Sequence, residues 1–103
     1  MTFELSVTDI AYLQDAYDYA KMGLVPAGAY KNKRYSIDKV EVGSVNETYL
    51  DLLYDPQTSG GLLVAVSAGH AKALLQELCD AGLPAAIVGE VTEKETAEIT
   101  VEM

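Results

Sequence analysis

The first residues of the chain alternate between apolar and polar side chains. Phe3, Leu5 and Val7 would lie on one face of an extended segment, and the polar residues between them on the other. This period of two is typical of a strand with one buried face, so we expect a strand over residues 2–7.

A helical period follows, with apolar residues three or four positions apart. We expect Thr8 to be the N-cap of this helix and Gly23 to end it. Its apolar face would hold Ile10, Leu13, Tyr17, Ala20 and Leu24. Residues 24–37 break the period, so we expect an ordered loop there, followed by a short strand at residues 40–42.

Ser44 and Glu47 have the spacing of a capping box, which predicts a short helix through Leu53. That helix must end before Pro56, because a proline forces the preceding residue into an extended conformation. Residues 55–61 are then expected to form a turn-rich loop.

The apolar run Leu62–Val66 predicts a strand buried on both faces. A second long helix is expected from its cap at Ser67 to its end at Gly82, with Cys79 on the buried apolar face. Ala85–Val91 and Ala97–Val101 are expected to be two more strands, the last one at an edge of the sheet.

This order of elements predicts an α/β (α+β) fold, a mixed β-sheet with helices packed on it, in one domain over residues 1–103. The chain has 16 acidic and 7 basic residues and a net charge of −9, which disfavours nucleic acid and anionic membranes as partners. There is no apolar run of about 18 residues that would cross a membrane. A single cysteine and no signal-type N-terminus indicate a cytoplasmic protein.

Three stretches carry a family resemblance: Asp55–Leu63 (DPQTSGGLL), Gly23–Asn32 (GLVPAGAYKN) and Ala86–Val91 (AIVGEV). In order and spacing they resemble the selenophosphate synthetases (selenide, water dikinases), which are related to aminoimidazole ribonucleotide synthetase. Ala27 and Ala29 depart from that family's pattern, where glycine and threonine are usual.

The resemblance implies that the chain is the C-terminal α/β domain of a two-domain enzyme that works as a homodimer. The family uses ATP and magnesium to convert selenide into selenophosphate, with AMP and phosphate as the other products. Its catalytic cysteine or selenocysteine, its lysine and its magnesium-binding aspartates lie in segments that have no counterpart here. We therefore expect no catalytic residue, no metal site and no tightly bound cofactor in this chain, no activity by the chain alone, and the N-terminal domain as its partner.

The candidate site residues are Asp55, Gln57, Thr58, Ser59, Gly60, Gly61, Lys31 and Asn32. The loop from Thr58 to Gly61 either forms a nest of backbone N–H groups for an anion or serves as a tight turn. Asp55 either orients a metal or a basic partner, or caps the turn. Lys31 and Asn32 belong to the only basic cluster, which either contacts phosphate or the N-terminal domain or is solvated.

Two other functions are open. The chain is either a domain of a sister enzyme related to aminoimidazole ribonucleotide synthetase or a free-standing module that binds a small anion or a partner protein. The intact Asp55–Leu63 run argues against the sister enzyme. A domain that is cut from its enzyme would expose an apolar patch where the missing domain docks, which a free-standing module would not need.

Overall fold

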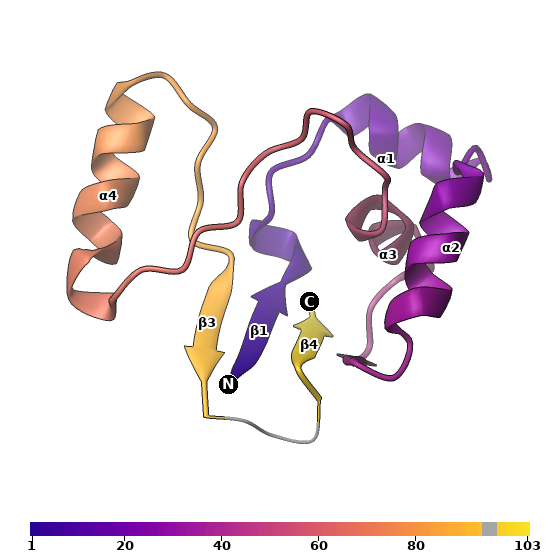
Figure 1. The fold of residues 1–103 in the computed structure, drawn as a ribbon. Helices are drawn as coiled ribbons and strands as arrows, with labels where there is room; N and C mark the ends of the chain where they lie inside the picture. Colours follow the sequence, from indigo (N-terminus) through magenta and orange to yellow (C-terminus); the bar gives the residue numbers. More distant parts are fainter. Residues whose placement is uncertain (94–96) are drawn as a thin grey trace.

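The computed structural model describes residues 1–93 and 97–103, which form a mixed sheet with helices around it (Figure 1). This confirms the fold class predicted from the sequence. In chain order the elements are β1 (Thr2–Ser6), the 3-10 turn η1 (Val7–Asp9), α1 (Gln14–Lys21), α2 (Ala27–Ser36), β2 (Val40–Val42), α3 (Glu47–Leu53), α4 (Ala68–Asp80), β3 (Gly89–Thr92) and β4 (Ile99–Glu102).

The sheet has the strand order β2-β4-β1-β3. β4 runs parallel to both β1 and β2, and β3 runs antiparallel to β1. Strand β1 was predicted and is confirmed. The prediction that the last strand lies at an edge is wrong, because β2 pairs with the far side of β4 and takes the edge position. The strand predicted over residues 85–91 is also shorter, since only Gly89–Thr92 pairs with β1.

The core forms between this sheet and α3. Val7, Leu50 and Val101 are buried together, and five half-buried apolar residues pack around them: Val40, Val45, Tyr49, Leu53 and Ile99. Thr2 is fully buried, and its hydroxyl donates a hydrogen bond of 2.8 Å to the carbonyl oxygen of Ala97. The two ends of the chain are therefore tied into the same core.

Helix α1 begins later than the sequence predicted. Ile10 and Leu13 have extended backbones, so the predicted start at Thr8 is wrong; the end is confirmed by Gly23, whose φ is +85°. Three tyrosine rings then join this region to α3. The ring centroids of Tyr17 and Tyr49 lie 5.1 Å apart, and Tyr12 lies within 6.0 Å of both.

Residues 27–36 form helix α2, so the ordered loop predicted for residues 24–37 is wrong. Pro26, extended at φ −60°, is its N-cap residue, and only Ala29 is buried. A helix that is polar almost all round carries no apolar period for sequence reasoning to detect. The capping residue predicted for α3 is wrong as well. Asn46, not Ser44, accepts a hydrogen bond from the backbone N–H of Thr48.

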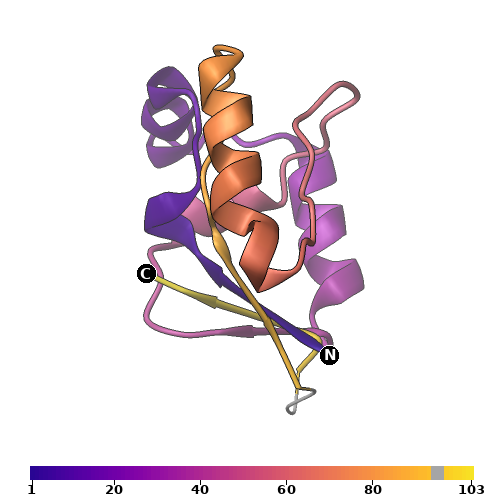
Figure 2. The ribbon, with the colours of Figure 1, turned by 90° about the vertical axis from the view of Figure 1, so that its left-hand side faces the viewer.

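Helix α4 stands beyond β3, on the opposite side of the molecule from α2 (Figures 1 and 2). It contains no buried residue, so the predicted burial of Cys79 is wrong. Ser67 is its N-cap residue, but the hydroxyl lies 2.6 Å from Nδ1 of His70 instead of capping a backbone N–H. The predicted end at Gly82 is confirmed by that residue's φ of +81°.

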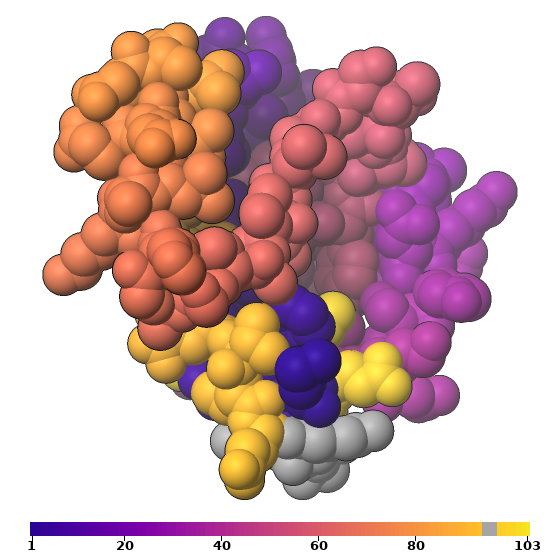
Figure 3. Space-filling view, turned by 60° about the vertical axis from the view of Figure 1, so that its left-hand side comes forward, coloured from indigo at the N-terminus to yellow at the C-terminus, as the bar shows by residue number. Residues whose placement is uncertain are grey.

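The run Leu62–Val66 is not a strand. It is an exposed extended segment that crosses the surface between α4 and the α2–α3 side of the molecule (Figure 3). The exposed fraction reaches 92% for Leu62 and 65% for Leu63. The prediction of a strand buried on both faces is therefore wrong for the described part of the chain, which offers this segment neither a pairing strand nor a cover.

Candidate functional site

The loop Asp55–Gly61 begins directly after α3. The backbone N–H of Asp55 donates to the carbonyl oxygen of Leu52 at 3.3 Å, which continues the last turn of the helix. Asp55 is half-buried, and every residue from Pro56 to Gly61 is exposed. The start of this loop is therefore where the sequence predicted it, but its predicted end at Gly61 is wrong, because no strand follows and the irregular segment continues to Ser67.

At Gly60 the backbone is not left-handed, and the side chain of Gln57 occupies the space where a Cβ atom would lie. A Cβ atom at Gly60 would lie 3.1 Å from both Cβ and Cδ of Gln57, whose side chain folds back over it. Gly61 has nothing within 4 Å of such an atom. The exposed side chain of Gln57 can turn away from Gly60, so this contact is compatible with both a tight turn and an anion nest, and Thr58 and Ser59 lie on an exposed surface.

Helix α2 contacts the start of this loop at two places. A Cβ atom at Gly28 would lie 2.7 Å from Cγ of Pro56, so the helix and the proline ring pack at the distance that only glycine allows. One turn further on, the side-chain amide of Asn32 donates a hydrogen bond of 2.8 Å to the carbonyl oxygen of Tyr54. Two of the three stretches that carry the family resemblance are thus in contact.

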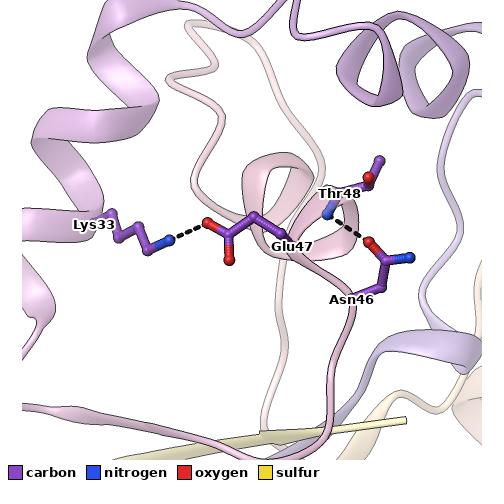
Figure 4. Close-up of polar contacts among 4 residues, drawn as sticks. All are labelled: Lys33, Asn46, Glu47 and Thr48. Atoms are coloured by element: carbon purple, nitrogen blue, oxygen red, sulfur yellow. Dashed lines mark hydrogen bonds and ion pairs between the residues drawn. The ribbon is translucent and has the colours of Figure 1, made fainter.

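The residues of the basic cluster on α2 differ in their partners: Lys33 pairs with a residue of this chain, and Lys31 is exposed to solvent. Lys33 forms an ion pair with Glu47 at the start of α3, beside the Asn46 cap (Figure 4). The hydrogen bond that Lys33 donates to the Glu47 carboxylate raises the pKa of Lys33 above its ordinary value. Lys31 is exposed, and within residues 1–93 and 97–103 no ion pair reaches it. Lys31 therefore remains available to an external anion.

Sequence reasoning missed the partners of these contacts. The carbonyl oxygen of Tyr54 is a main-chain group, for which the sequence has no signal. The pairing of Lys33 with Glu47 links residues 14 positions apart on different helices. Asp51 was also missed. It lies on α3, and partial burial and the nearby Glu47 carboxylate raise its pKa, while Lys33 lowers it to a smaller extent.

Two observations bear on metals and membranes. Among the described residues, no three His, Cys, Asp or Glu side chains come close enough together to hold a metal ion. No helix in the same part of the chain has the length and apolar character needed to cross a bilayer.

The chain is similar to proteins named selenide, water dikinase. It is 47% identical to selenide, water dikinase 2 of Peptoclostridium acidaminophilum over 102 residues, which cover 98% of the chain and 29% of that protein. The enzymes of Pelobacter propionicus and Caldanaerobacter subterraneus subsp. tengcongensis are 44% and 40% identical, over 91% and 98% of the chain and 28% and 30% of their own lengths. The chain thus spans less than a third of each of these relatives.

These relatives confirm the resemblance to selenophosphate synthetases that the three sequence stretches predicted. The chain also matches the family described as "AIR synthase related protein, C-terminal domain" over residues 10–102, from the segment before α1 to the end of β4. With nearly the whole fold inside this match, the chain belongs to the family of C-terminal domains of AIR-synthase-related proteins.

Proposed function

We propose that the chain acts as the C-terminal domain of a selenide, water dikinase of the cytoplasm. The whole enzyme would convert selenide, ATP and water into selenophosphate, AMP and phosphate with the help of magnesium. The observation that carries the proposal is the 47% identity to a protein of that name over 98% of the chain. The contact of Gly28 with Pro56 supports it, because it joins two stretches typical of these enzymes, and the bond of Asn32 to Tyr54 holds them together from the neighbouring residue.

Within that enzyme, the Asp55–Gly61 loop would contact an anionic group of the nucleotide or of the facing domain. Residues 56–61 are exposed, and in the described part of the chain no backbone hydrogen bond uses the N–H groups of Gln57 to Gly61. The hydroxyls of Thr58 and Ser59 and the ammonium group of Lys31 would add to this anion-binding surface.

The chain alone would be inactive. Phosphoryl transfer requires cations and a positioned nucleophile around the phosphates. The one cysteine, Cys79, lies on α4 across the molecule from α2, and its thiol faces the carbonyl oxygen of Ala85 at 3.9 Å. The described residues contain no cluster of side chains that could bind magnesium. The N-terminal domain would therefore supply the nucleophile and the magnesium ligands, and the whole enzyme would be a homodimer.

The exposed run Leu62–Val66 supports a docking partner of this kind. Four large apolar side chains in five residues are between 45% and 92% exposed: Leu62, Leu63, Val64 and Val66. An uninterrupted apolar strip of this type marks a surface that another protein segment covers. Since the strip directly follows the Asp55–Gly61 loop, docking there would also bring the loop to the interface.

The test is a chimaera in which this chain replaces the matching segment of the Peptoclostridium acidaminophilum relative. Selenide-dependent release of AMP from ATP is measured for the chimaera, for the relative with that segment deleted and for this chain alone. We expect activity within about tenfold of the relative for the chimaera, a difference of about 1.4 kcal/mol in activation free energy, and none for the other two.

Two variants of the chimaera locate the contribution of the loop. Replacement of Thr58 and Ser59 by alanine should raise KM for ATP or lower kcat, whereas Ser44→Ala, outside the loop, should change neither. A folded chimaera without selenide-dependent AMP release would contradict the proposed function. Activity in this chain alone would contradict the assignment of the catalytic groups to another domain.

A further inference from the structure

A hollow of about 240 Å³ lies where α1, the α1–α2 connection and α3 meet. Its walls are mostly apolar, formed by side chains that include Ala16, Ala20, Leu24 and Val25. Two carboxylates, those of Asp51 and Asp55, stand among them. An apolar cavity with a few polar groups is the usual form of a binding site, and the polar groups determine which ligand it takes.

Neither carboxylate is in an ion pair with a described residue, and Lys33 acts on Asp51 only as a nearby charge. Within residues 1–93 and 97–103, the ion pair of Lys33 goes to Glu47, and no ion pair reaches Asp51 or Asp55. Partial burial raises the pKa of Asp51, so its negative charge is held where it is unfavourable without a partner. A carboxylate that costs stability in the free protein is typical of a functional site.

The backbone adds negative potential to the same place. Helix α1 ends at Lys21 and α3 ends at Leu53, and the residues that follow each end line the hollow. A helix C-terminus carries about half a negative charge. At the end of α1 the carbonyl oxygens of Tyr19 and Ala20 accept from backbone N–H groups that follow the helix, and Lys21 lies in its last turn, so the preference for a cation comes chiefly from the two carboxylates.

The size of the hollow indicates whether the cation belongs to a small molecule or to a protein side chain. Cavities for small-molecule ligands measure about 300–1,000 Å³, so this one is small for them and suits a single side chain. Its rim carries Tyr19 and Leu24, which are 54% and 65% exposed. A polypeptide would cover this apolar rim, whereas a free amine would leave it in water.

We propose that this hollow binds a lysine side chain from another polypeptide segment. The aliphatic stem would lie against Ala20 and Leu24, and Nζ would lie between the carboxylates of Asp51 and Asp55. The cavity and its charges are independent of the reaction proposed above. The chain spans 28 to 30% of the relatives' lengths. The rest of such a protein could contain the segment that supplies this lysine.

The test is an NMR titration of the 15N-labelled chain with the blocked peptide acetyl-Gly-Lys-Gly-amide. The matched control peptide has norleucine in place of lysine, which keeps most of the stem and removes the charge. We expect saturable shifts of the amide signals of Ala16, Ala20 and Asp51 with the lysine peptide. The norleucine peptide should bind at least about tenfold more weakly, a difference of about 1.4 kcal/mol.

Variants and a third probe separate the alternatives. Asp51→Asn and Asp55→Asn should each weaken lysine-peptide binding about tenfold while the dispersion of the NMR signals shows an intact fold. Asp38→Asn, an exposed carboxylate away from the hollow, should leave it unchanged. The proposal is overturned if both peptides bind equally, if the two Asp variants bind like the parent, or if n-pentylammonium binds as tightly as the peptide, which would indicate a site for free amines.

Discussion

The side-chain amide of Asn32 donates a hydrogen bond of 2.8 Å to the main-chain carbonyl oxygen of Tyr54. The two residues are 22 positions apart, and the bond fixes α2 against the residue directly before the candidate loop. Asn32 thereby sets the position of Lys31 and of the whole basic cluster relative to that loop.

Replacing Asn32 by alanine should lower the free energy of unfolding by about 0.5–1.5 kcal/mol, because the carbonyl of Tyr54 loses its side-chain donor. Urea unfolding followed by circular dichroism measures the change. Gln14→Ala removes an exposed bond to Asp18 within α1 and should cost only about 0.2–0.5 kcal/mol. Equal losses in the two variants would argue that the Asn32 bond is an ordinary surface contact.

Gly28→Ala should destabilise the chain although alanine favours helices. The new methyl group would meet the ring of Pro56 at 2.7 Å, and overpacking of this kind costs about 1–3 kcal/mol. Gly69→Ala in α4 is the matched control. It meets nothing within 4 Å and should be neutral or stabilising by up to about 1 kcal/mol. A stable Gly28 variant would show that α2 and the loop separate freely.

Asn46→Ala should cost about 1 kcal/mol in the free energy of unfolding, because the backbone N–H of Thr48 loses its capping oxygen. Ser44→Ala should have an effect within about 0.5 kcal/mol, since its hydroxyl has no capping role at α3. Thermal denaturation of the two variants side by side distinguishes the cap that the sequence predicted from the one that the structure contains. The reverse order of stabilities would restore Ser44 as the cap.

Asp51→Asn should raise stability at neutral pH in the absence of any ligand. The pKa of Asp51 in the folded chain lies above its ordinary value of 3.8, first because of burial and then because of the charge of Glu47. Its ionised form is therefore less favourable in the folded than in the unfolded chain, and its contribution to stability falls as the pH rises through the folded-state pKa.

The difference between Asp51→Asn and the parent, measured as the midpoint of urea unfolding, should be largest near pH 7, shrink as the pH falls through the raised folded-state pKa, and vanish below about 3.8. Asp38→Asn, at an exposed position, changes the net charge by the same amount and controls for charge alone. If both variants show the same pH dependence, net charge and not the position of Asp51 is responsible.

Leu62→Ser should change the free energy of unfolding by less than about 0.5 kcal/mol, because the side chain is 92% exposed. Leu50→Ala, in the core beside Val7 and Val101, should cost about 2–5 kcal/mol. Leu62→Ser should also reduce binding of a hydrophobic dye, which measures the exposed strip directly. A large loss of stability at Leu62 would indicate that the strip is buried in solution.

Local signals account for what the sequence predicted correctly. The alternation of residues 2–7, glycine at positions 23 and 82 and the proline at position 56 each act on their immediate neighbours, and the elements they bound are found in the structure. The loop Asp55–Gly61 belongs to this group. Its start follows from Pro56 and the end of α3, whereas its predicted end depended on a strand at residues 62–66 that does not form.

Long-range contacts account for what the sequence did not predict. Helix α2 has little apolar face and depends on contacts with Pro56 and Tyr54, which no period reveals. The central position of β4 depends on which strands pair with it, not on its own alternation. Asp51 resembles any solvated carboxylate on a helix, and only the meeting of α1 with α3 places it in a hollow.

The parallel pairing of β1 with β4 has a consequence for how this unit is made. The first and last strands of the unit lie side by side inside the sheet, and the β1–β4 pairing joins residues about 95 positions apart, such as Phe3 and Ile99. A nascent chain that has left the ribosome only as far as α4 lacks the strand that β1 and β2 both need. It must therefore keep its apolar strand faces open until the last residues emerge, and chaperones would meet the unit in that unfinished state.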